Sequence, residues 1–271
     1  MKINHRSIFF KSQFGTLSIT FRPGTPLFLF IHGLGGCRNH FDDSFVSVYG
    51  KCYGILTVDL LGFGDSDHFE KLPKMMLSAQ IEALSELMIE MGINEITLVL
   101  HSLASALLPA ILTCKKWPNL TKLVLIEADL LTSHASWGKK LALMDDITFD
   151  NYITRFKLNS TQVMRLQLKG IHSQLQTKAW SNCFQTLDVK ALQSMAKDCS
   201  RIIQQGRIQV FVNQLTIPIE YIYGSESDVA TNILEMTTIF HFLFSPILKA
   251  GHYPMLDNPE ETYMRIFSNI L

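Results

Sequence analysis

Hydrophobic residues occur along this chain in short continuous runs, separated by segments in which apolar residues recur at helical spacing. The continuous runs predict buried strands at residues 27–31, 54–58, 95–100, 122–126, 217–223 and 242–248. Helical spacing predicts helices at residues 74–91, 103–116, 229–238 and 259–270. Residues 7–10 and 16–21 flank Gly15 and predict an N-terminal hairpin. Strands that alternate with helices predict an α/β fold with a mostly parallel central sheet and helices on both faces.

The alternation stops after Asp129 and returns near residue 217. The intervening residues show no convincing strand pattern, and their apolar spacing predicts helices at 136–144, 160–171, 174–183 and 189–205. A helical stretch that interrupts an α/β alternation is typical of a lid. We therefore expect an α/β core made of residues 1–131 and 214–271, with a helical cap at 132–213 inserted after the sixth strand.

Composition narrows the function classes. The 271 residues are 47% hydrophobic and 18% charged, which suits a large buried core. Lys and Arg (24) balance Asp and Glu (24), so net charge predicts no nucleic-acid partner. No apolar run reaches the ~20 residues of a membrane span, and the polar start lacks a signal-peptide core. We expect a cytoplasmic protein, monomeric or homodimeric. Its five scattered cysteines, without a C-x-x-C pair, predict reduced thiols rather than disulfides or a metal site.

One corner of the predicted sheet carries candidate chemistry. The apolar run that ends at Leu100 leads into His101-Ser102-Leu103-Ala104, where small residues open a helix-compatible segment. This strand–turn–helix corner would present the Ser102 hydroxyl above the sheet, which is the logic of the nucleophile elbow G-x-S-x-G. Leu100 stands where glycine is usual, and a bulky residue there would widen the elbow or lower activity.

A serine hydroxyl needs a neighbouring base, which in turn needs an orienting carboxylate. His252 follows the predicted strand 242–248 and Gly251, and Asp228 follows the predicted strand 217–223. The order Ser, Asp, His makes Asp228 the expected carboxylate. A helix N-cap is the rival interpretation of Asp228. The alternative carboxylates are Glu226 in the same loop and, after the strand 122–126, Glu127 and Asp129.

Further motifs stand at other strand ends. His32-Gly33-Leu34-Gly35-Gly36 follows the strand 27–31, Asp59-Leu60-Leu61-Gly62-Phe63-Gly64-Asp65-Ser66 follows the strand 54–58, and Met255-Leu256-Asp257-Asn258-Pro259-Glu260 comes soon after Gly251-His252. Together with His101-Ser102-Leu103, these motifs follow one another along the chain in the order found in the α/β-hydrolase fold superfamily. The chain therefore resembles this superfamily, in its capped serine hydrolase or esterase branch. The resemblance covers nearly the whole chain.

The resemblance implies a role for each matching residue. Ser102 would be the nucleophile, His252 the general base and acid, and Asp228 the orienting carboxylate. The backbone N–H groups of Leu34 and Leu103 would form an oxyanion hole. The residues expected to support the site are His32, Gly33, Asp59 and His101.

The expected activity is hydrolysis of a carboxylic ester or thioester of a small to medium apolar substrate through an acyl-enzyme. The only implied partner is that small molecule, and no metal or organic cofactor is implied. A carbon–carbon bond hydrolase or a cofactor-free peroxidase would use the same triad. The non-enzymatic alternative, motivated by Leu100, is a hydrolase-fold protein that binds a ligand and has lost efficient catalysis.

Overall fold

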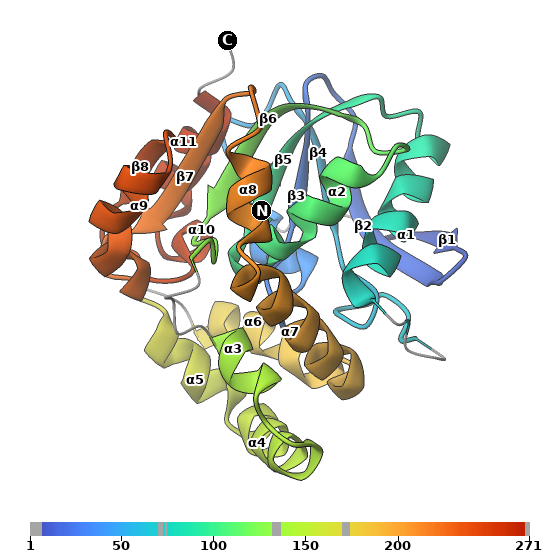
Figure 1. Cartoon of the computed structure of the whole chain (residues 1–271), viewed down its shortest axis with the longest axis vertical. Helices are drawn as coiled ribbons and strands as arrows, with labels where there is room; N and C mark the ends of the chain where they lie inside the picture. Colours follow the sequence, from blue (N-terminus) through green and yellow to red (C-terminus); the bar gives the residue numbers. More distant parts are fainter. Residues whose placement is uncertain (1–6, 70–72, 74, 132–136, 170–173, 269–271) are drawn as a thin grey trace.

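The computed structural model describes residues 7–69, 73, 75–131, 137–169 and 174–268. Its sheet has the strand order β1-β2-β4-β3-β5-β6-β7-β8 (Figure 1). These strands are β1 Ile8–Ser12, β2 Gly15–Arg22, β3 Leu27–Ile31, β4 Gly54–Val58, β5 Glu95–His101, β6 Asn119–Ile126, β7 Ile219–Gly224 and β8 Leu243–Ile247. The β1–β2 and β2–β4 pairs are antiparallel, and every other neighbouring pair is parallel. The predicted fold class, a mostly parallel sheet with a hairpin at its edge, is confirmed.

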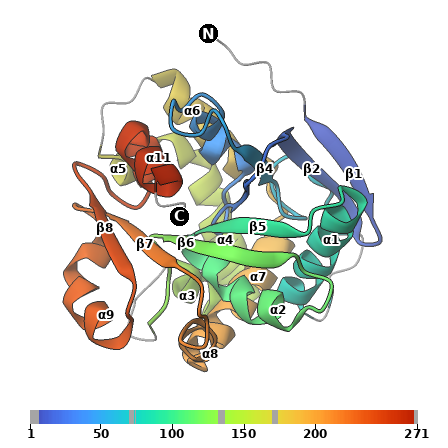
Figure 2. The same cartoon turned by 90° about the horizontal axis from the view of Figure 1, so that it is seen from above.

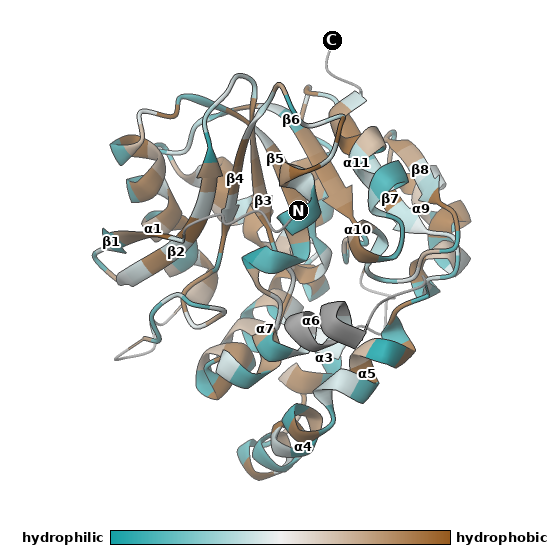
Figure 3. Ribbon diagram, turned by 180° about the vertical axis from the view of Figure 1, so that it is seen from behind, coloured by the Kyte–Doolittle hydropathy of each residue, from teal (hydrophilic) through white to brown (hydrophobic). Residues whose placement is uncertain are grey.

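Helices cover both faces of this sheet, which explains why its central strands are continuous apolar runs. Figure 2 shows α11 (Pro259–Ser268) on one face and α1 (Met76–Glu90) and α2 (Leu108–Thr113) on the other. All five residues of β3 and all five of β4 are buried. On the α11 face, Phe28 of β3 meets Phe267 edge to face, with ring centroids 4.7 Å apart. Figure 3 shows the same pattern as brown, hydrophobic strands inside the molecule.

The described residues between β6 and β7 form six helices, which we call the helical segment. They are α3 Trp137–Ala142, α4 Asp146–Leu158, α5 Ser160–Gln167, α6 Gln174–Thr186, α7 Val189–Gln204 and α8 Arg207–Val212. Four of them, α3 to α6, gather beyond one end of the sheet (Figure 1). Helix α7 begins where the Asp188 carboxylate accepts hydrogen bonds from the backbone N–H groups of Lys190 and Ala191.

The helical boundaries differ from the prediction in several places, of which three lie in or before the helical segment. Helices α4 and α8 were not predicted. Helix α4 buries only Phe149 and Ile153, so its apolar periodicity is weak. The predicted helix 103–116 begins instead as the 3-10 helix η2, Ser102–Leu107, and becomes α-helical only at Leu108.

The expectation that every cysteine is a free thiol was wrong. Cys37 and Cys183 form a disulfide across a sequence separation of 146 residues, whereas Cys52, Cys114 and Cys199 are free. The bond joins the loop after β3 to α6 of the helical segment. Among the described residues, no helix is both long enough and apolar enough to cross a bilayer.

Candidate active site

Ser102 lies directly after β5 in a left-handed backbone conformation, with φ of 53°. That conformation costs a residue other than glycine about 1–2 kcal/mol, because Cβ crowds the backbone. A Cβ added to Gly33 would lie 3.0 Å from Ser102 Cβ, so the glycine lets its loop approach the serine. Leu100 is fully buried in β5, opposite Ile31 and Leu125. The sharp corner therefore exists with leucine at the position where glycine is usual.

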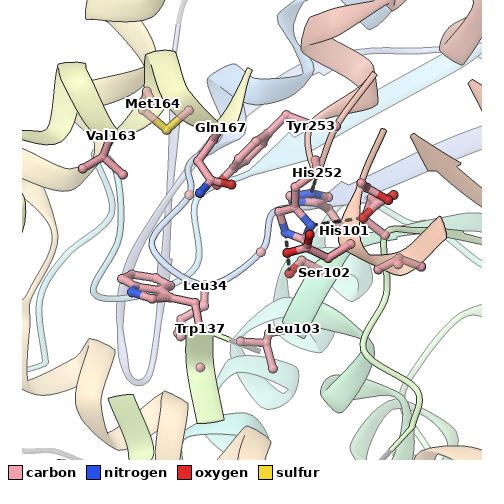
Figure 4. Close-up of a pocket in the computed structure, with 18 of the residues that line it drawn as sticks. Leu34, His101, Ser102, Leu103, Trp137, Val163, Met164, Gln167, His252 and Tyr253 are labelled. Carbon is pink, nitrogen blue, oxygen red and sulfur yellow. Dashed lines mark hydrogen bonds and ion pairs between the residues drawn. The ribbon is translucent and has the colours of Figure 1, made fainter. Parts of the chain in front are cut away.

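The imidazole of His252 lies next to the Ser102 hydroxyl. His252 precedes the short helix α10 (Pro254–Asp257), and its Nε2 is 3.0 Å from Ser102 Oγ (Figure 4). On the other side of the ring, Nδ1 lies 3.2 Å from Oε2 of Glu127. When Nδ1 carries the proton and donates it to Glu127, Nε2 is free to accept the proton of Ser102. The structure thus brings together a serine, a histidine and a carboxylate in one hydrogen-bonded line.

The carboxylate of Glu127 is held in place from two directions. Glu127 follows β6 with φ of 50°, a second left-handed residue in the site, and its side chain is completely buried. Its Oε1 accepts a hydrogen bond of 2.7 Å from the backbone N–H of Gly224 at the end of β7. Because Gly224 occupies one oxygen, the other oxygen faces His252. This arrangement fixes both the position and the orientation of the Glu127 carboxylate.

The assignment of Asp228 as the orienting carboxylate is therefore corrected. Asp228 is exposed at the first position of the 3-10 helix η3 (Asp228–Asn232), and no hydrogen bond or ion pair joins it to His252 within the described residues. Its N-cap interpretation is also wrong, because Ser227 caps η3 by accepting from the N–H of Ala230. The Nδ1 position that Asp228 was expected to fill is taken by Glu127.

The two other candidate carboxylates also line the cavity at this site. Asp129 is buried, and its backbone carbonyl accepts a hydrogen bond of 3.1 Å from Ser105 Oγ. Glu226 is exposed, and its backbone N–H donates to Ala250 O. Neither has a hydrogen bond to His252 among the contacts described for the imidazole.

The charges around His252 set its protonation. Burial opposes the imidazolium, but the hydrogen bond and charge of Glu127 outweigh it, with smaller help from Asp129 and Asp228, so the pKa of His252 is raised. His101 differs, because burial and the charge of His252 hold its pKa well below the ordinary value. A neutral His101 donates from Nε2 to the backbone carbonyl of His252, 2.9 Å away. His101 therefore ties the His252 loop to the end of β5.

The expected oxyanion donors, Leu34 and Leu103, come from two segments that meet at Ser102. Leu103 is the second residue of η2, where a helix leaves its N–H without an internal partner. Leu34 lies in the loop after β3, which turns through a hydrogen bond of 3.0 Å from Gly36 N to Gly33 O. Both residues line the same cavity as Ser102.

His32 and Asp59 connect the loops that surround these donors. His32 donates from Nδ1 to Gly33 O at 2.8 Å, and its Nε2 accepts from Leu60 N at 3.1 Å. Asp59 accepts from the backbone N–H of Arg38 at 2.6 Å and also pairs with the Arg38 guanidinium. The guanidinium in turn binds Asp65 at 2.8 Å. The contribution of Arg38 was missed, because a single arginine after a glycine-rich loop carries no recognisable signal.

A cavity of about 450 Å³ opens in front of Ser102 and His252. The wall that the helical segment contributes is largely apolar and contains Trp137, Phe156, Val163, Met164 and Phe184. Figure 4 shows Trp137, Val163 and Met164 across the cavity from Ser102, with the side chain of Gln167 projecting into it. Exposed polar residues line another part of the wall and include Lys169, Glu226 and Asp228.

Comparison with solved structures shows the same fold over nearly the whole chain. An N-formylmaleamic acid deformylase from Pseudomonas putida matches at 17% identity and a TM-score of 0.72, covering 97% of this chain and 100% of its own. A thermophilic esterase from Thermogutta terrifontis and a putative aryl esterase from Burkholderia cenocepacia each match at 15% identity and a TM-score of 0.73, covering 97% of both chains. At such identities the likeness establishes the fold alone.

A comparison with curated protein sequences found no match. The family model described as the alpha/beta hydrolase family matches residues 28–265. This range includes the sharp turn at Ser102, the loops that carry Glu127 and His252, and the helical segment above them. With the sheet order and the family match in agreement, the chain belongs to the alpha/beta hydrolase family.

Proposed function

We propose that this protein hydrolyses a carboxylic ester or thioester with a small to medium apolar acyl group, through an acyl-enzyme on Ser102. The observation that carries the proposal is the continuous line from Ser102 Oγ to His252 Nε2 at 3.0 Å and from His252 Nδ1 to Glu127 Oε2 at 3.2 Å. In this proposal the triad is Ser102, His252 and Glu127.

The first half of the reaction forms the acyl-enzyme. Ser102 Oγ attacks the substrate carbonyl while His252 Nε2 accepts the hydroxyl proton. The N–H groups of Leu34 and Leu103 stabilise the negative oxygen of the tetrahedral intermediate. One such donor is typically worth about 3–4 kcal/mol of the barrier. The carbon–oxygen or carbon–sulfur bond then breaks, and the imidazolium gives its proton to the leaving alcohol or thiol.

The second half repeats the same proton transfers with water. His252 accepts a proton from a water molecule that attacks the acyl-enzyme, and the intermediate collapses to release the carboxylic acid and Ser102. The imidazolium formed in each half is stabilised by the buried negative charge of Glu127. In each half-reaction His252 holds a proton from the attack on the carbonyl until the tetrahedral intermediate collapses. The raised pKa of His252 fits this role.

The cavity supports the proposed acyl group. A volume of about 450 Å³ admits a small to medium molecule, and Trp137, Val163 and Met164 supply an apolar wall from the helical segment, which would act as a cap. The exposed polar side chains of Lys169 and Glu226 lie in the same cavity and suit a leaving group that stays hydrated.

A substrate screen tests this proposal. We expect faster turnover of short and medium p-nitrophenyl esters and thioesters than of long-chain triglyceride emulsions, with no turnover above background in Ser102→Ala. Comparable or better activity on long-chain emulsions would refute the size assignment. Activity that survives in Ser102→Ala would refute the nucleophile. Including carbon–carbon bond substrates and a peroxidase assay compares the two other reactions that use this triad.

The non-enzymatic alternative was motivated by Leu100. The φ of Ser102 and its 3.0 Å distance from His252 favour an enzyme instead, since both are the geometry that an activated serine needs.

A further inference from the structure

Two cysteines and a histidine come together beside the candidate active site and take no part in the proposed reaction. Cys37 is the N-cap of the 3-10 helix η1 (Arg38–Phe45), and His40 is the third residue of that helix. Cys183 comes from α6 of the helical segment. All three side chains are buried. Cys183 lies beside Cys37 although the two residues are 146 positions apart in the sequence. The fold therefore places a second cysteine, distant in the sequence, beside the C-x-x-H pair of Cys37 and His40.

The three side chains are close enough to share one ion. Both sulfur atoms and a ring nitrogen of His40 lie within 4.8 Å of one another, and His40 Nε2 is 3.8 Å from Cys183 Sγ. Zinc binds thiolate sulfur at about 2.3 Å and imidazole nitrogen at about 2.0–2.1 Å. In a tetrahedral site, ligand atoms at those lengths are separated by about 3.3–3.8 Å. The distance from His40 Nε2 to Cys183 Sγ already lies in this range, and the two sulfur atoms would move apart to about 3.8 Å once the disulfide is reduced.

The imidazole of His40 is free to act as a ligand. Its Nδ1 has no hydrogen-bond partner among the described residues, and its Nε2 faces Cys183. A neutral ring with the proton on Nδ1 directs the Nε2 lone pair at the two sulfur atoms. Thiolates and imidazole are the ligands that zinc prefers.

The cluster borders the active-site cavity. His40 lines this cavity together with Gly36, although its side chain is buried. Water from the cavity can fill a fourth coordination position, as in other zinc sites with three protein ligands.

We propose that, in the dithiol state, Cys37, His40 and Cys183 bind one Zn²⁺, so that the disulfide and the metal site are alternative states of the same residues. A dithiol reductant supplies two electrons and two protons, becomes a disulfide itself, and leaves two thiols here. Zn²⁺ then displaces the two thiol protons as it binds. The proposal does not rest on the proposed hydrolytic reaction.

Either state would link α6 to the loop that carries Leu34. A Cβ added to Gly35 would lie 2.9 Å from Cε1 of Phe184, so the residue after Cys183 already covers this loop. The Phe184 ring also meets Phe156 edge to face, with centroids 4.9 Å apart. The switch between disulfide and metal therefore acts at the contact between the helical segment and the expected oxyanion loop.

Metal titration of the full chain tests the proposal. The protein is reduced with a dithiol, the reductant is removed without oxygen, and Zn²⁺ is titrated against a chromophoric chelator. Co²⁺ is then used as a spectroscopic probe of thiolate ligation. We expect one equivalent of Zn²⁺ and a sulfur-to-cobalt charge-transfer band in the reduced protein, and neither in the oxidised protein.

Single variants assign the ligands. Cys37→Ser and Cys183→Ser are expected to weaken Zn²⁺ binding at least about 100-fold, because loss of a ligand exceeds the 10–100-fold effect of losing an outer-shell partner. The matched control, Cys52→Ser, changes an exposed free thiol and is expected to bind like the original protein. His40→Gln keeps both thiols and is expected to weaken binding at least about 10-fold, which covers the case in which a cysteine variant fails to fold. Absence of stoichiometric binding in the reduced protein, or unchanged affinity in Cys37→Ser and His40→Gln, would overturn the proposal.

Discussion

Replacing Glu127 by Gln is the sharpest single perturbation of the proposed triad. The backbone N–H of Gly224 donates to Glu127 Oε1 at 2.7 Å, so the carbonyl oxygen of a glutamine is expected to stay at that position. The amide NH₂ then faces His252 Nδ1, which must accept a hydrogen bond instead of donating one. This reverses the tautomer and places the proton on Nε2, where it blocks transfer from Ser102.

The corresponding acid-to-amide change in the Ser-His-Asp template lowers kcat by about 10⁴-fold, which is the value that we adopt. This loss corresponds to about 5.5 kcal/mol of transition-state stabilisation. Asp228→Asn is the matched control, because Asp228 is exposed and has no hydrogen bond to His252. We expect it to change kcat/KM by less than about threefold, since an exposed charge acts weakly through solvent.

The assay is steady-state hydrolysis of the best p-nitrophenyl ester from the screen, with circular dichroism to verify that both variants fold. A fall of about 10³-fold or more in Asp228→Asn, together with near-normal activity in Glu127→Gln, would refute the assignment of the acid and restore the carboxylate that the sequence favours.

Three further predictions follow from the geometry. The kcat/KM should rise with pH through the raised pKa of His252, because only the neutral ring accepts a proton. In Glu127→Gln the inflection of the pH–rate profile should move to lower pH, because the charge that raises this pKa is gone. An inflection at the same pH in both proteins would contradict this. Leu100→Ala should destabilise the protein by about 2–5 kcal/mol in urea without raising kcat, whereas a faster variant would mean that leucine impairs the elbow. Lys122→Met should cost roughly 3–5 kcal/mol in the same measurement, because it removes the ammonium group from a buried ion pair with Glu220 at 3.0 Å; a loss below about 1 kcal/mol would refute this.

Much of the fold could be predicted because its central strands are buried on both faces. Such strands must be continuously apolar, and β3 and β4 have the same bounds as the runs at 27–31 and 54–58. The helical segment was less predictable. Helix α4 faces solvent over most of its length, and α8 has only six residues, so neither shows a strong apolar period.

The candidate site also has a part that the sequence predicts and a part that it does not. Ser102 and His252 follow strands within distinctive motifs, and the structure places them 3.0 Å apart. The carboxylate could not be chosen from sequence, because Glu127 and Asp228 both follow parallel strands. The choice depends on the left-handed backbone of Glu127 and on the Gly224 N–H that holds its carboxylate, and neither leaves a sequence signal. The contact between Cys37 and Cys183 likewise depends on how the helical segment brings α6 back to the loop after β3.

The central claim is that Ser102 is an activated nucleophile. The most direct measurement is intact-protein mass after treatment with a fluorophosphonate, which phosphonylates a serine only where a base and an oxyanion hole act together. We predict one adduct per chain, mapped to Ser102 by peptide mass and absent from Ser102→Ala. No adduct on the folded protein, or an adduct that remains in Ser102→Ala, would contradict the account.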